Sequence, residues 1–304
     1  MWEEKPIYSS KLTYLKIPYY NSLLSKKIEG IVRTCPNIIH LNFENCVGFS
    51  NRALNQLKAY PNLRYLNLCH SGIMGDKALC RMVGLCRKIK YLNIFFCQGI
   101  TNRSLIKIAE SCQALQEFHF ACTHLISERF ISHILNLCLN LRRFSILGSC
   151  RRKNRCDILV EKHFTLEKHL NVEKHLSVEY LDFGRCVYVA ETSICNTIHS
   201  CLNLQYLNLN FCEITDVIIK EISCLCLYLK HLNLEGCVNI TKEAIDQLIS
   251  FNPNIYVENF MNSMDMRAEL DQEIRGLYNT RHRVGNIQNS VLSQIYRDLI
   301  PIHL

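Results

Sequence analysis

Histidine and cysteine are the residue types in this sequence that could carry metal or thiol chemistry, with 12 His and 18 Cys in 304 residues. Three histidines, His163, His169 and His175, recur every six residues in EKHFTLEKHLNVEKHLSV at 161–178. A step of six residues turns each His by about 240° on a helix and separates neighbours by about 20 Å on a strand. Zinc ligands must converge to within about 2.1 Å of one ion, so this spacing argues against a metal site.

The cysteines give no clear metal set either. Cys224 and Cys226 are separated by one residue, whereas structural zinc sites usually contain two Cys-x-x-Cys pairs. Cys150 and Cys156 could join His163, but their spacing is nonstandard. No phosphate-binding loop, nucleophile elbow, dinucleotide fingerprint or zinc-protease motif occurs. The sequence therefore predicts no catalytic, cofactor-binding or metal-binding residues, and a protein that is not an enzyme.

Composition favours a globular chain in a reducing compartment. Apolar residues make up 48% of the sequence and charged residues 20%, which are ordinary globular values. The start, MWEEKPIYSS, has no apolar segment of a secretory signal, and no 18-residue apolar run predicts a membrane span. Eighteen cysteines without an export signal favour buried thiols over disulfides. We therefore expect a cytoplasmic and/or nuclear protein, monomeric and without a membrane partner.

One pattern, apolar-x-x-apolar-x-apolar, recurs along almost the whole chain. Successive copies begin 25 or 26 residues apart, except for one interval of 37 residues that contains the EKH stretch. Each copy alternates like a strand, and helical periodicity follows it, with Thr101, Thr215 and Thr241 placed as helix N-caps. The copies begin at Leu12, Ile38, Leu63, Ile89, Leu115, Leu141, Val178, Leu204, Leu229 and Ile255.

A strand and a helix within 26 residues cannot bury both of their apolar faces alone, but stacked copies can. The sequence therefore predicts an α/β right-handed solenoid of about nine to ten repeats over residues 1–260. Its parallel strands would line the concave face and its helices the convex face. Residues 261–304 contain two polar helical segments, which we expect to form a C-terminal cap.

Eleven of the cysteines follow the same repeat. Six stand three residues before the first apolar position and five stand eight residues after it, where a small apolar side chain fills the turn between strand and helix. The first set is Cys35, Cys86, Cys112, Cys138, Cys201 and Cys226, and the second is Cys46, Cys97, Cys186, Cys212 and Cys237. Cys69, Cys122 and Cys150 fall near predicted strand ends and are the candidates for an activated thiol.

The segments CLNLQYLNLNFCEITD at Cys201 and CLYLKHLNLEGCVNITK at Cys226 carry a specific resemblance. They resemble the cysteine-containing leucine-rich repeats of the F-box/LRR proteins, which form RNI-like solenoids and act as substrate receptors of cullin-RING ubiquitin ligases. The resemblance covers residues 9 to about 260. No F-box is recognisable among the eleven residues before Leu12.

The resemblance implies substrate recognition in SCF-type, ubiquitin-dependent protein degradation. Ligase adaptor and cullin components would then be partners if an F-box exists elsewhere. The alternative is a stand-alone LRR scaffold or inhibitor that binds a regulatory protein without a ligase link.

The expected partner surface is the concave face, where the third and fifth positions of each strand alternate with buried residues. Tyr recurs at the third position and Asn at the fifth, and aromatic residues of this kind dominate protein-binding surfaces. Alternatively, Tyr and Asn are simply common at these positions of the repeat class. The predicted surface comprises Tyr65, Asn67, Tyr91, Asn93, Phe95, Phe96, Glu117, His119, Arg143, Tyr180, Asp182, Tyr206, Asn208, Phe211 and His231.

Two repeats break the Tyr-Asn pattern, with Glu117 and His119 in one and Arg143 and Ser145 in the next. We expect a specific partner to be recognised there.

The net charge of +8 is concentrated near the long interval. Six basic residues lie between positions 142 and 155 with no acid among them. This cluster could dock an acidic partner, or it could be a solvated loop. A nucleic-acid partner is not favoured, because no aromatic interleaving or recognition motif accompanies it.

The neighbouring insertion, about 151–175, contains KHLNVE at Lys168, which nearly repeats KHLNLE at Lys230. We interpret it as a neutral loop expansion, with a partner-contacting loop as the alternative.

Overall fold

The computed structural model describes residues 11–20, 25–46, 49–72, 74–122, 129–148, 177–186 and 189–258. The chain divides into two compact units, Met1–Phe260 and Met261–Leu304. The second unit lies outside the described residues, so the helical cap at 261–304 stays a prediction. The insertion at 151–175, with its EKH stretch, and Cys150 also lie outside them.

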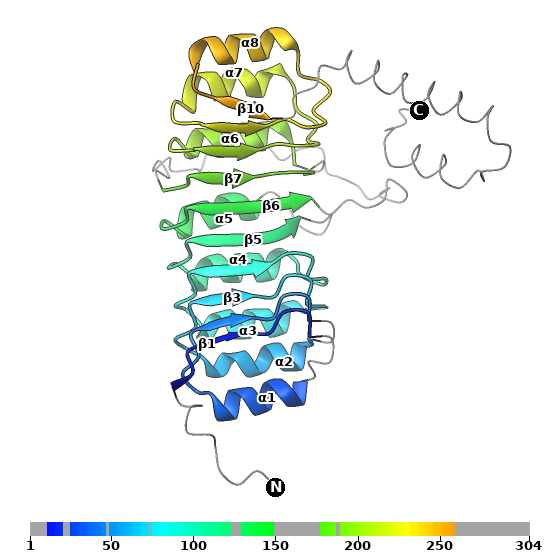
Figure 1. Ribbon diagram of the computed structural model, residues 1–304, viewed down its shortest axis with the longest axis vertical. Helices are drawn as coiled ribbons and strands as arrows, with labels where there is room; N and C mark the ends of the chain where they lie inside the picture. Colours follow the sequence, from blue (N-terminus) through cyan, green and yellow to red (C-terminus); the bar gives the residue numbers. More distant parts are fainter. Residues whose placement is uncertain are drawn as a thin grey trace, which may run out of the picture. The chain divides into compact units, whose positions relative to one another are not determined.

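The first unit contains one parallel sheet of ten strands in sequence order (Figure 1). Equivalent repeat positions pair across it, as where Tyr65 lies opposite Tyr91 and Tyr91 opposite Glu117. The strands are β1 (Tyr14–Lys16), β2 (His40–Asn42), β3 (Tyr65–Asn67), β4 (Tyr91–Ile94), β5 (Glu117–Cys122), β6 (Arg143–Gly148), β7 (Tyr180–Asp182), β8 (Tyr206–Asn208), β9 (His231–Asn233) and β10 (Tyr256–Glu258).

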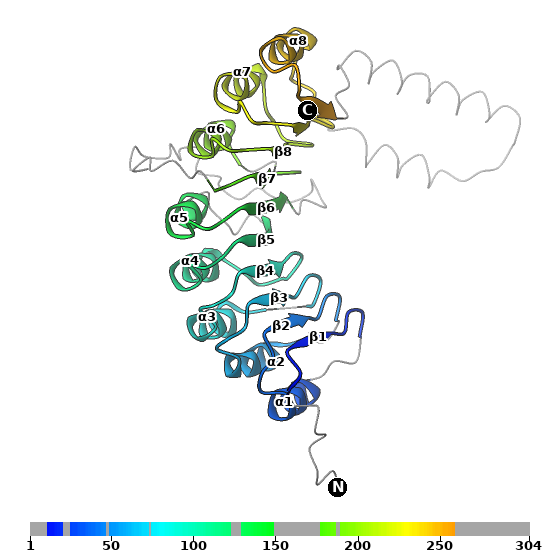
Figure 2. The same ribbon diagram turned by 60° about the vertical axis from the view of Figure 1, so that its left-hand side comes forward.

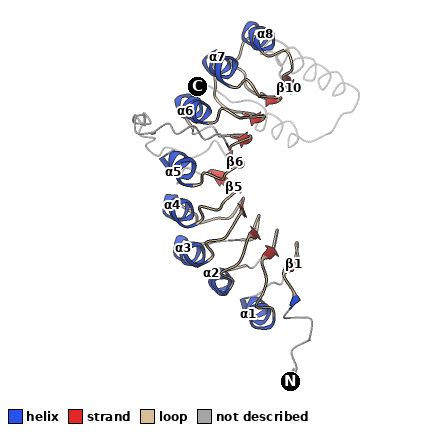
Figure 3. Ribbon diagram, turned by 90° about the vertical axis from the view of Figure 1, so that its left-hand side faces the viewer, coloured by secondary structure: helices blue, strands red, loops and turns tan. Residues whose placement is uncertain are grey.

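Helices cover one face of this sheet and leave the other open. Figures 2 and 3 show the helices on the outside of the curved stack and the strands along its inner, concave side. The helices are α1 (Ser25–Thr34), α2 (Asn51–Gln56) with the 3₁₀ turn η2 (Leu57–Ala59), α3 (Asp76–Leu85), α4 (Asn102–Ser111), α5 (Arg129–Leu137), α6 (Glu191–Ser200), α7 (Asp216–Leu225) and α8 (Lys242–Phe251). The predicted α/β solenoid, with concave strands and convex helices, is confirmed.

Each repeat contributes its first, fourth and sixth positions to a continuous core. In the third repeat these are Leu63, Leu66 and Leu68, all fully buried. Burying one such side chain stabilises the fold by about 1.5–3 kcal/mol. A single repeat has nothing to bury them against, so the core exists only between stacked copies.

An acidic side chain in the first turn of one helix accepts hydrogen bonds from the Thr that caps the N-terminus of the next helix. The Asp76 carboxylate accepts hydrogen bonds from the backbone N–H of Thr101 at 3.0 Å and from its hydroxyl at 2.6 Å. Thr101 in turn caps α4 by accepting from Arg103 N–H. Glu191 with Thr215, and Asp216 with Thr241, repeat the arrangement. These bonds hold the pKa of the Asp76 carboxyl below its ordinary value, against the opposing effect of burial.

The repeated cysteines are more than small apolar fillers. Each of the five that stand eight residues after the first apolar position donates its thiol to the sixth-position carbonyl of the preceding repeat. The weak S–H donor bonds a carbonyl near the end of the strand ladder, and in three repeats the same carbonyl also accepts a backbone N–H. The pairs are Cys46 with Ile17, Cys97 with Leu68, Cys186 with Ile146, Cys212 with Phe183 and Cys237 with Leu209, at 2.7–3.1 Å.

Candidate protein-binding surface

The third strand positions form two aromatic stacks on the concave face. In the N-terminal stack, Tyr14, His40, Tyr65 and Tyr91 follow one another with ring centroids 3.8–4.0 Å apart and planes within 19° of parallel. Because parallel strands lie about 4.8 Å apart, equivalent side chains are brought into this contact. Burial raises the pKa of Tyr65, with a smaller contribution from Tyr91, so its hydroxyl stays protonated.

The C-terminal stack comprises Tyr180, Tyr206, His231 and Tyr256 and is looser. Tyr180 and Tyr206 are parallel at 4.4 Å, but the next two contacts open to 6.2 and 5.8 Å, with planes at 36° and 70°. Both stacks mix Tyr with His, so residue type does not explain the difference. The sequence prediction named Tyr65, Tyr91, Tyr180, Tyr206 and His231, and it omitted the outer members of both stacks.

The fifth positions differ from the expectation. Asn67, Asp182 and Asn233 are buried, with 5%, 9% and 9% of their surface exposed, and Asn93 and Asn208 are half-buried. Their side chains turn back to the backbone: Asn67 Oδ1 accepts from Cys69 N–H at 3.0 Å, and Asp182 Oδ1 accepts from Gly184 N–H at 2.8 Å. The expectation that all fifth-position side chains point outward is therefore wrong for the buried ones. These side chains bond the backbone where the strand ends.

The two repeats that break the pattern also break this turn. His119 and Ser145 replace Asn at the fifth position, and β5 and β6 run for six residues where most strands have three. Pairing continues through Cys122 opposite Gly148. Without an Asn acceptor at the fifth position, the N–H of the seventh position remains available to the strand ladder. The sequence predicted that these two repeats differ from the others, and the structure shows that they differ by having longer strands without the Asn turn.

A central polar group separates the two aromatic stacks. It comprises Glu117, His119, Arg143, Ser145 and Asp182. His119 Nε2 lies 3.7 Å from a Glu117 carboxylate oxygen, and the Ser145 hydroxyl donates to Asp182 at 2.9 Å. The Arg143 guanidinium lies over the Tyr180 ring at 5.4 Å. The prediction that these repeats differ in character is supported by this geometry; the binding of a partner there stays a prediction.

Burial perturbs the ionisation of two members of this group, the half-buried His119 and the buried Asp182. It lowers the pKa of His119 below its ordinary 6.5, against an opposing effect of Glu117. It also raises the pKa of Asp182, against the hydrogen bonds from Gly184 and Ser145. Both shifts favour the uncharged form, as expected for groups removed from water. At neutral pH His119 is therefore a neutral donor and acceptor beside Glu117.

A second row of exposed side chains lies at the eighth repeat position, in the turn after each strand. His70, Phe96, Arg185 and Phe211 have φ angles of 53–60°, in the left-handed region. This conformation costs a residue with a side chain roughly 1–2 kcal/mol, and Gly236 occupies the same position in the next repeat. Glycine or Asn adopts this conformation at less cost, so these four bulky side chains are candidates for a role in binding.

The side chains of this turn row pair with each other. His70 stacks on Phe96 at 4.3 Å, and the Arg185 guanidinium lies over the Phe211 ring at 4.6 Å. Phe96 and Phe211 remain 38% exposed, and the half-buried Phe95 contacts His119 at 5.7 Å. The sequence prediction contained all three Phe residues but missed His70 and Arg185, which their shared eighth position would have revealed.

The thiol candidates show no activation where they are described. Burial raises the pKa of Cys69 to about 11, which disfavours the thiolate and argues against a reactive Cys69. The side chain of Cys122 lies outside the described set. Among the described residues, no group of three His, Cys, Asp or Glu side chains could hold a metal ion. No helix in the described segments is long and apolar enough to cross a membrane.

Stacked strand–helix units with apolar residues at fixed positions define a leucine-rich-repeat solenoid. The profile of the family described as "Leucine Rich repeat" matches residues 85–109 and 200–223. The chain is 25% identical over 250 residues to the F-box/LRR-repeat protein 4 of Bos taurus, covering 77% of this chain and 37% of that relative. The chain is thus similar to leucine-rich-repeat proteins of the F-box/LRR type, and it spans little more than a third of that relative's length. Such solenoids are typically binding scaffolds without catalytic activity.

Three solved structures match the chain at low sequence identity and with TM-scores below 0.5. The crystal structure of the Rad7 and Elc1 complex in yeast matches with a TM-score of 0.45 and 13% identity, covering 82% of this chain and 69% of that one. An internalin from Listeria monocytogenes matches with a TM-score of 0.42 and 13% identity, covering 82% of this chain and 61% of that one. The LegL7 protein of Legionella pneumophila matches with a TM-score of 0.41 and 14% identity, covering 81% and 82%.

Proposed function

We propose that this protein binds a protein partner on its concave face and thereby selects substrates for SCF-type, ubiquitin-dependent degradation. The observation that carries the binding role is the pair of aromatic stacks with the exposed Phe96 and Phe211 beside them. Aromatic anchors with a polar surround are the usual source of affinity in protein interfaces. The ligase link rests on the resemblance to F-box/LRR proteins, and we propose a binding rather than a catalytic role.

The test is affinity purification with mass spectrometry on the wild-type protein and a Tyr91→Ala, Phe96→Ala, Tyr206→Ala variant. These three substitutions remove one ring from each stack and one from the turn row. We expect the variant to lose the substrate partner while any ligase adaptor remains bound. A matched control is Leu227→Ala, Tyr228→Ala, Phe251→Ala, which removes three apolar side chains with 64–74% exposure that lie in none of these rows.

Two outcomes would contradict parts of this proposal. An unchanged partner list in the concave-face variant would show that the partner binds elsewhere. Recovery of a stoichiometric partner without any ligase adaptor would favour the alternative, a stand-alone scaffold or inhibitor of a regulatory protein.

We also propose a cytoplasmic and/or nuclear location. The support is that the fifteen cysteines whose side chains are described are all free thiols, which suits a reducing compartment. Fluorescence microscopy of the tagged full-length chain would test it, and accumulation in the secretory pathway would contradict it.

A further inference from the structure

A column of basic side chains lies along the edge of the sheet where β3 to β6 begin. Arg64, Lys90 and Arg142 occupy the second repeat position, with Gln116 between the last two. Direct backbone bonds place them on neighbouring strands: Lys90 N–H donates to Arg64, Gln116 N–H to Lys90 and Arg142 N–H to Gln116, at 2.7–2.8 Å. Residues 26 or more positions apart in sequence thus form one continuous row.

These cations are exposed, and none of them forms an ion pair with another described residue. The turn before β4 adds the exposed Arg87 and Lys88. No Asp or Glu occurs in the four helix-to-strand turns 60–64, 86–90, 112–116 and 138–142. We call Arg64, Arg87, Lys88, Lys90 and Arg142 the basic edge.

The basic edge ends at β7. There the second position is Glu179, and in the next two repeats it is Gln205 and Lys230, which are paired with each other at 3.1 Å. This row of positive charge is therefore confined to β3–β6, beside the N-terminal aromatic stack and the central polar group. At the neighbouring third position, Arg143 adds a further exposed cation and Glu117 is the one acid on these four strands.

We propose that the basic edge binds an acidic segment of the protein partner. This inference rests on the proposed function and adds to it the chemical character of the partner. Arg64 and Lys90 lie on neighbouring strands about 4.8 Å apart, and Arg142 lies two strands beyond Lys90, at about 9.6 Å, so the edge offers carboxylates a row of spaced sites. Arg adds bidentate geometry to the charge attraction. At the adjacent third position, burial raises the pKa of Tyr65, so its hydroxyl remains protonated and supplies a neutral donor.

The geometry favours a polypeptide over a single-stranded nucleic acid. Proteins bind single-stranded nucleic acids by stacking the bases on aromatic side chains whose ring faces are free. His40 and Tyr65 have both ring faces covered by their neighbours at 3.8–4.0 Å. The stack beside the basic edge therefore presents ring edges and hydroxyls, which suit carboxylate and amide groups.

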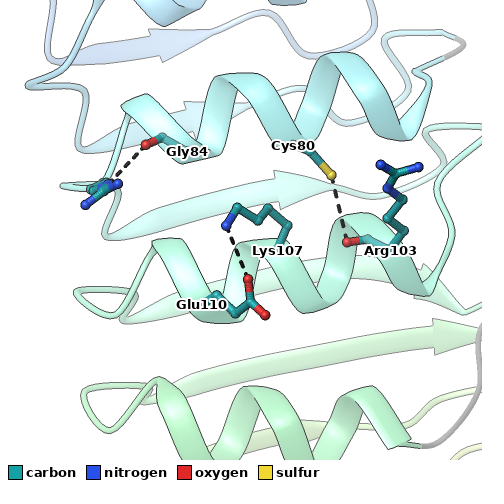
Figure 4. A network of polar contacts seen from close by, with 6 residues as sticks. Cys80, Gly84, Arg103, Lys107 and Glu110 are labelled. Carbon is teal, nitrogen blue, oxygen red and sulfur yellow. Dashed lines mark hydrogen bonds and ion pairs between the residues drawn. The ribbon is translucent and has the colours of Figure 1, made fainter.

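The experiment measures fluorescence anisotropy of a labelled synthetic peptide with alternating Glu and Ser residues against the full-length protein. Its control peptide carries Gln at every Glu. The edge variant is Arg64→Gln, Lys90→Gln, Arg142→Gln. The matched control variant, Arg81→Gln, Arg103→Gln, Lys220→Gln, removes the same charge from α3, α4 and α7, and Figure 4 shows Arg103 on the helix layer.

We expect the edge variant to weaken Glu-peptide binding by about tenfold or more, equivalent to about 1.4 kcal/mol, and the control variant by less than about twofold. The Gln peptide should bind the wild-type protein at least about tenfold more weakly than the Glu peptide. Equal losses in both variants, or equal binding of both peptides, would overturn the proposal. Tighter, edge-dependent binding of a single-stranded RNA of equal charge would overturn the assignment to a polypeptide.

Failure here is distinguishable from failure of the proposed function. If the edge variant keeps the partner recovered in affinity purification while the Tyr91, Phe96, Tyr206 variant loses it, the concave-face function holds. The acidic-segment inference would then be wrong.

Discussion

Regular repeats and the two central repeats of this solenoid end their strands in different ways. In six repeats an Asn or Asp at the fifth position accepts the N–H two residues ahead, as Asn208 does from Asn210 at 3.0 Å. In β5 and β6, His119 and Ser145 stand there and the strands continue to Cys122 and Gly148. The first strand is consistent with this rule, because its seventh position is Pro18, which has no N–H to donate.

The comparison shows that one side chain per repeat decides between a turn and a longer strand. Where the turn forms, the eighth position becomes a left-handed residue with an exposed side chain, as at His70 and Phe96. Where it does not, the concave face carries the central polar group instead. The Asn residues at the fifth position thus belong to the scaffold. The exposed side chains that differ between repeats lie at the third and eighth positions on either side of them.

The largest expected effect is at Gly148, where extended β6 approaches the next repeat. A Cβ there would overlap the carbonyl group of Arg185, which is backbone and cannot move aside. We expect Gly148→Ala to reduce the free energy of unfolding by about 4 kcal/mol, measured by chemical denaturation. The control is Gly84→Ala in α3, where a Cβ meets no atom within 4 Å and a small gain of about 0.5–1 kcal/mol is expected. Similar behaviour of the two variants would contradict the close approach.

The turn-forming role of the fifth position is tested by Asn67→Ala. The substitution leaves the buried N–H of Cys69 without its acceptor, and we expect a loss of about 2 kcal/mol in the free energy of unfolding. Ser145→Ala, at the same position of β6, removes one bond to Asp182 but ends no strand. It should cost about 1 kcal/mol. If both substitutions cost the same, the Asn side chain has no special role in the turn.

Converting a central repeat into a regular one should change structure more than stability. His119→Asn supplies the missing acceptor for the N–H of Ala121, and we expect β5 to shorten with a stability change below about 1 kcal/mol. Amide hydrogen exchange should become faster at Cys122 than in the wild type, because its strand pairing is lost, whereas Ala121 stays protected by its new acceptor. Unchanged exchange at Cys122 would show that other contacts hold the strand extended.

The smallest effect is a pH dependence from His119. Since its pKa in the folded state lies below 6.5, the unfolded chain binds a proton more readily, and stability falls as pH drops from about 7 through 6.5. Asp182 acts in the opposite direction but in a lower window, just above its ordinary 3.8. We expect Tm to fall less between pH 7.5 and 5.5 in His119→Gln than in the wild type. An identical slope in both proteins would assign the dependence to other groups.

Much of the fold and part of the candidate site could be read from the sequence. The 26-residue spacing predicted which residues share a column, so Tyr65 opposite Tyr91 and Tyr180 opposite Tyr206 were expected neighbours. The spacing could not predict the direction of the Asn67 side chain, because alternation along an ideal strand ends where the strand ends. For the same reason the exposed His70 and Arg185 were missed.

The sequence by itself determined the repeat, the parallel sheet and the columns of like residues, because a fixed period with buried apolar positions permits only stacking of equivalent units. Only the tertiary structure decided which polar positions are buried, where strands extend and which cations meet. Arg64, Lys90 and Arg142 become one edge because backbone hydrogen bonds join four strands that are distant in sequence. Those bonds, together with the turns that end most strands, bring residues of different repeats together into the aromatic stacks, the central polar group and the basic edge.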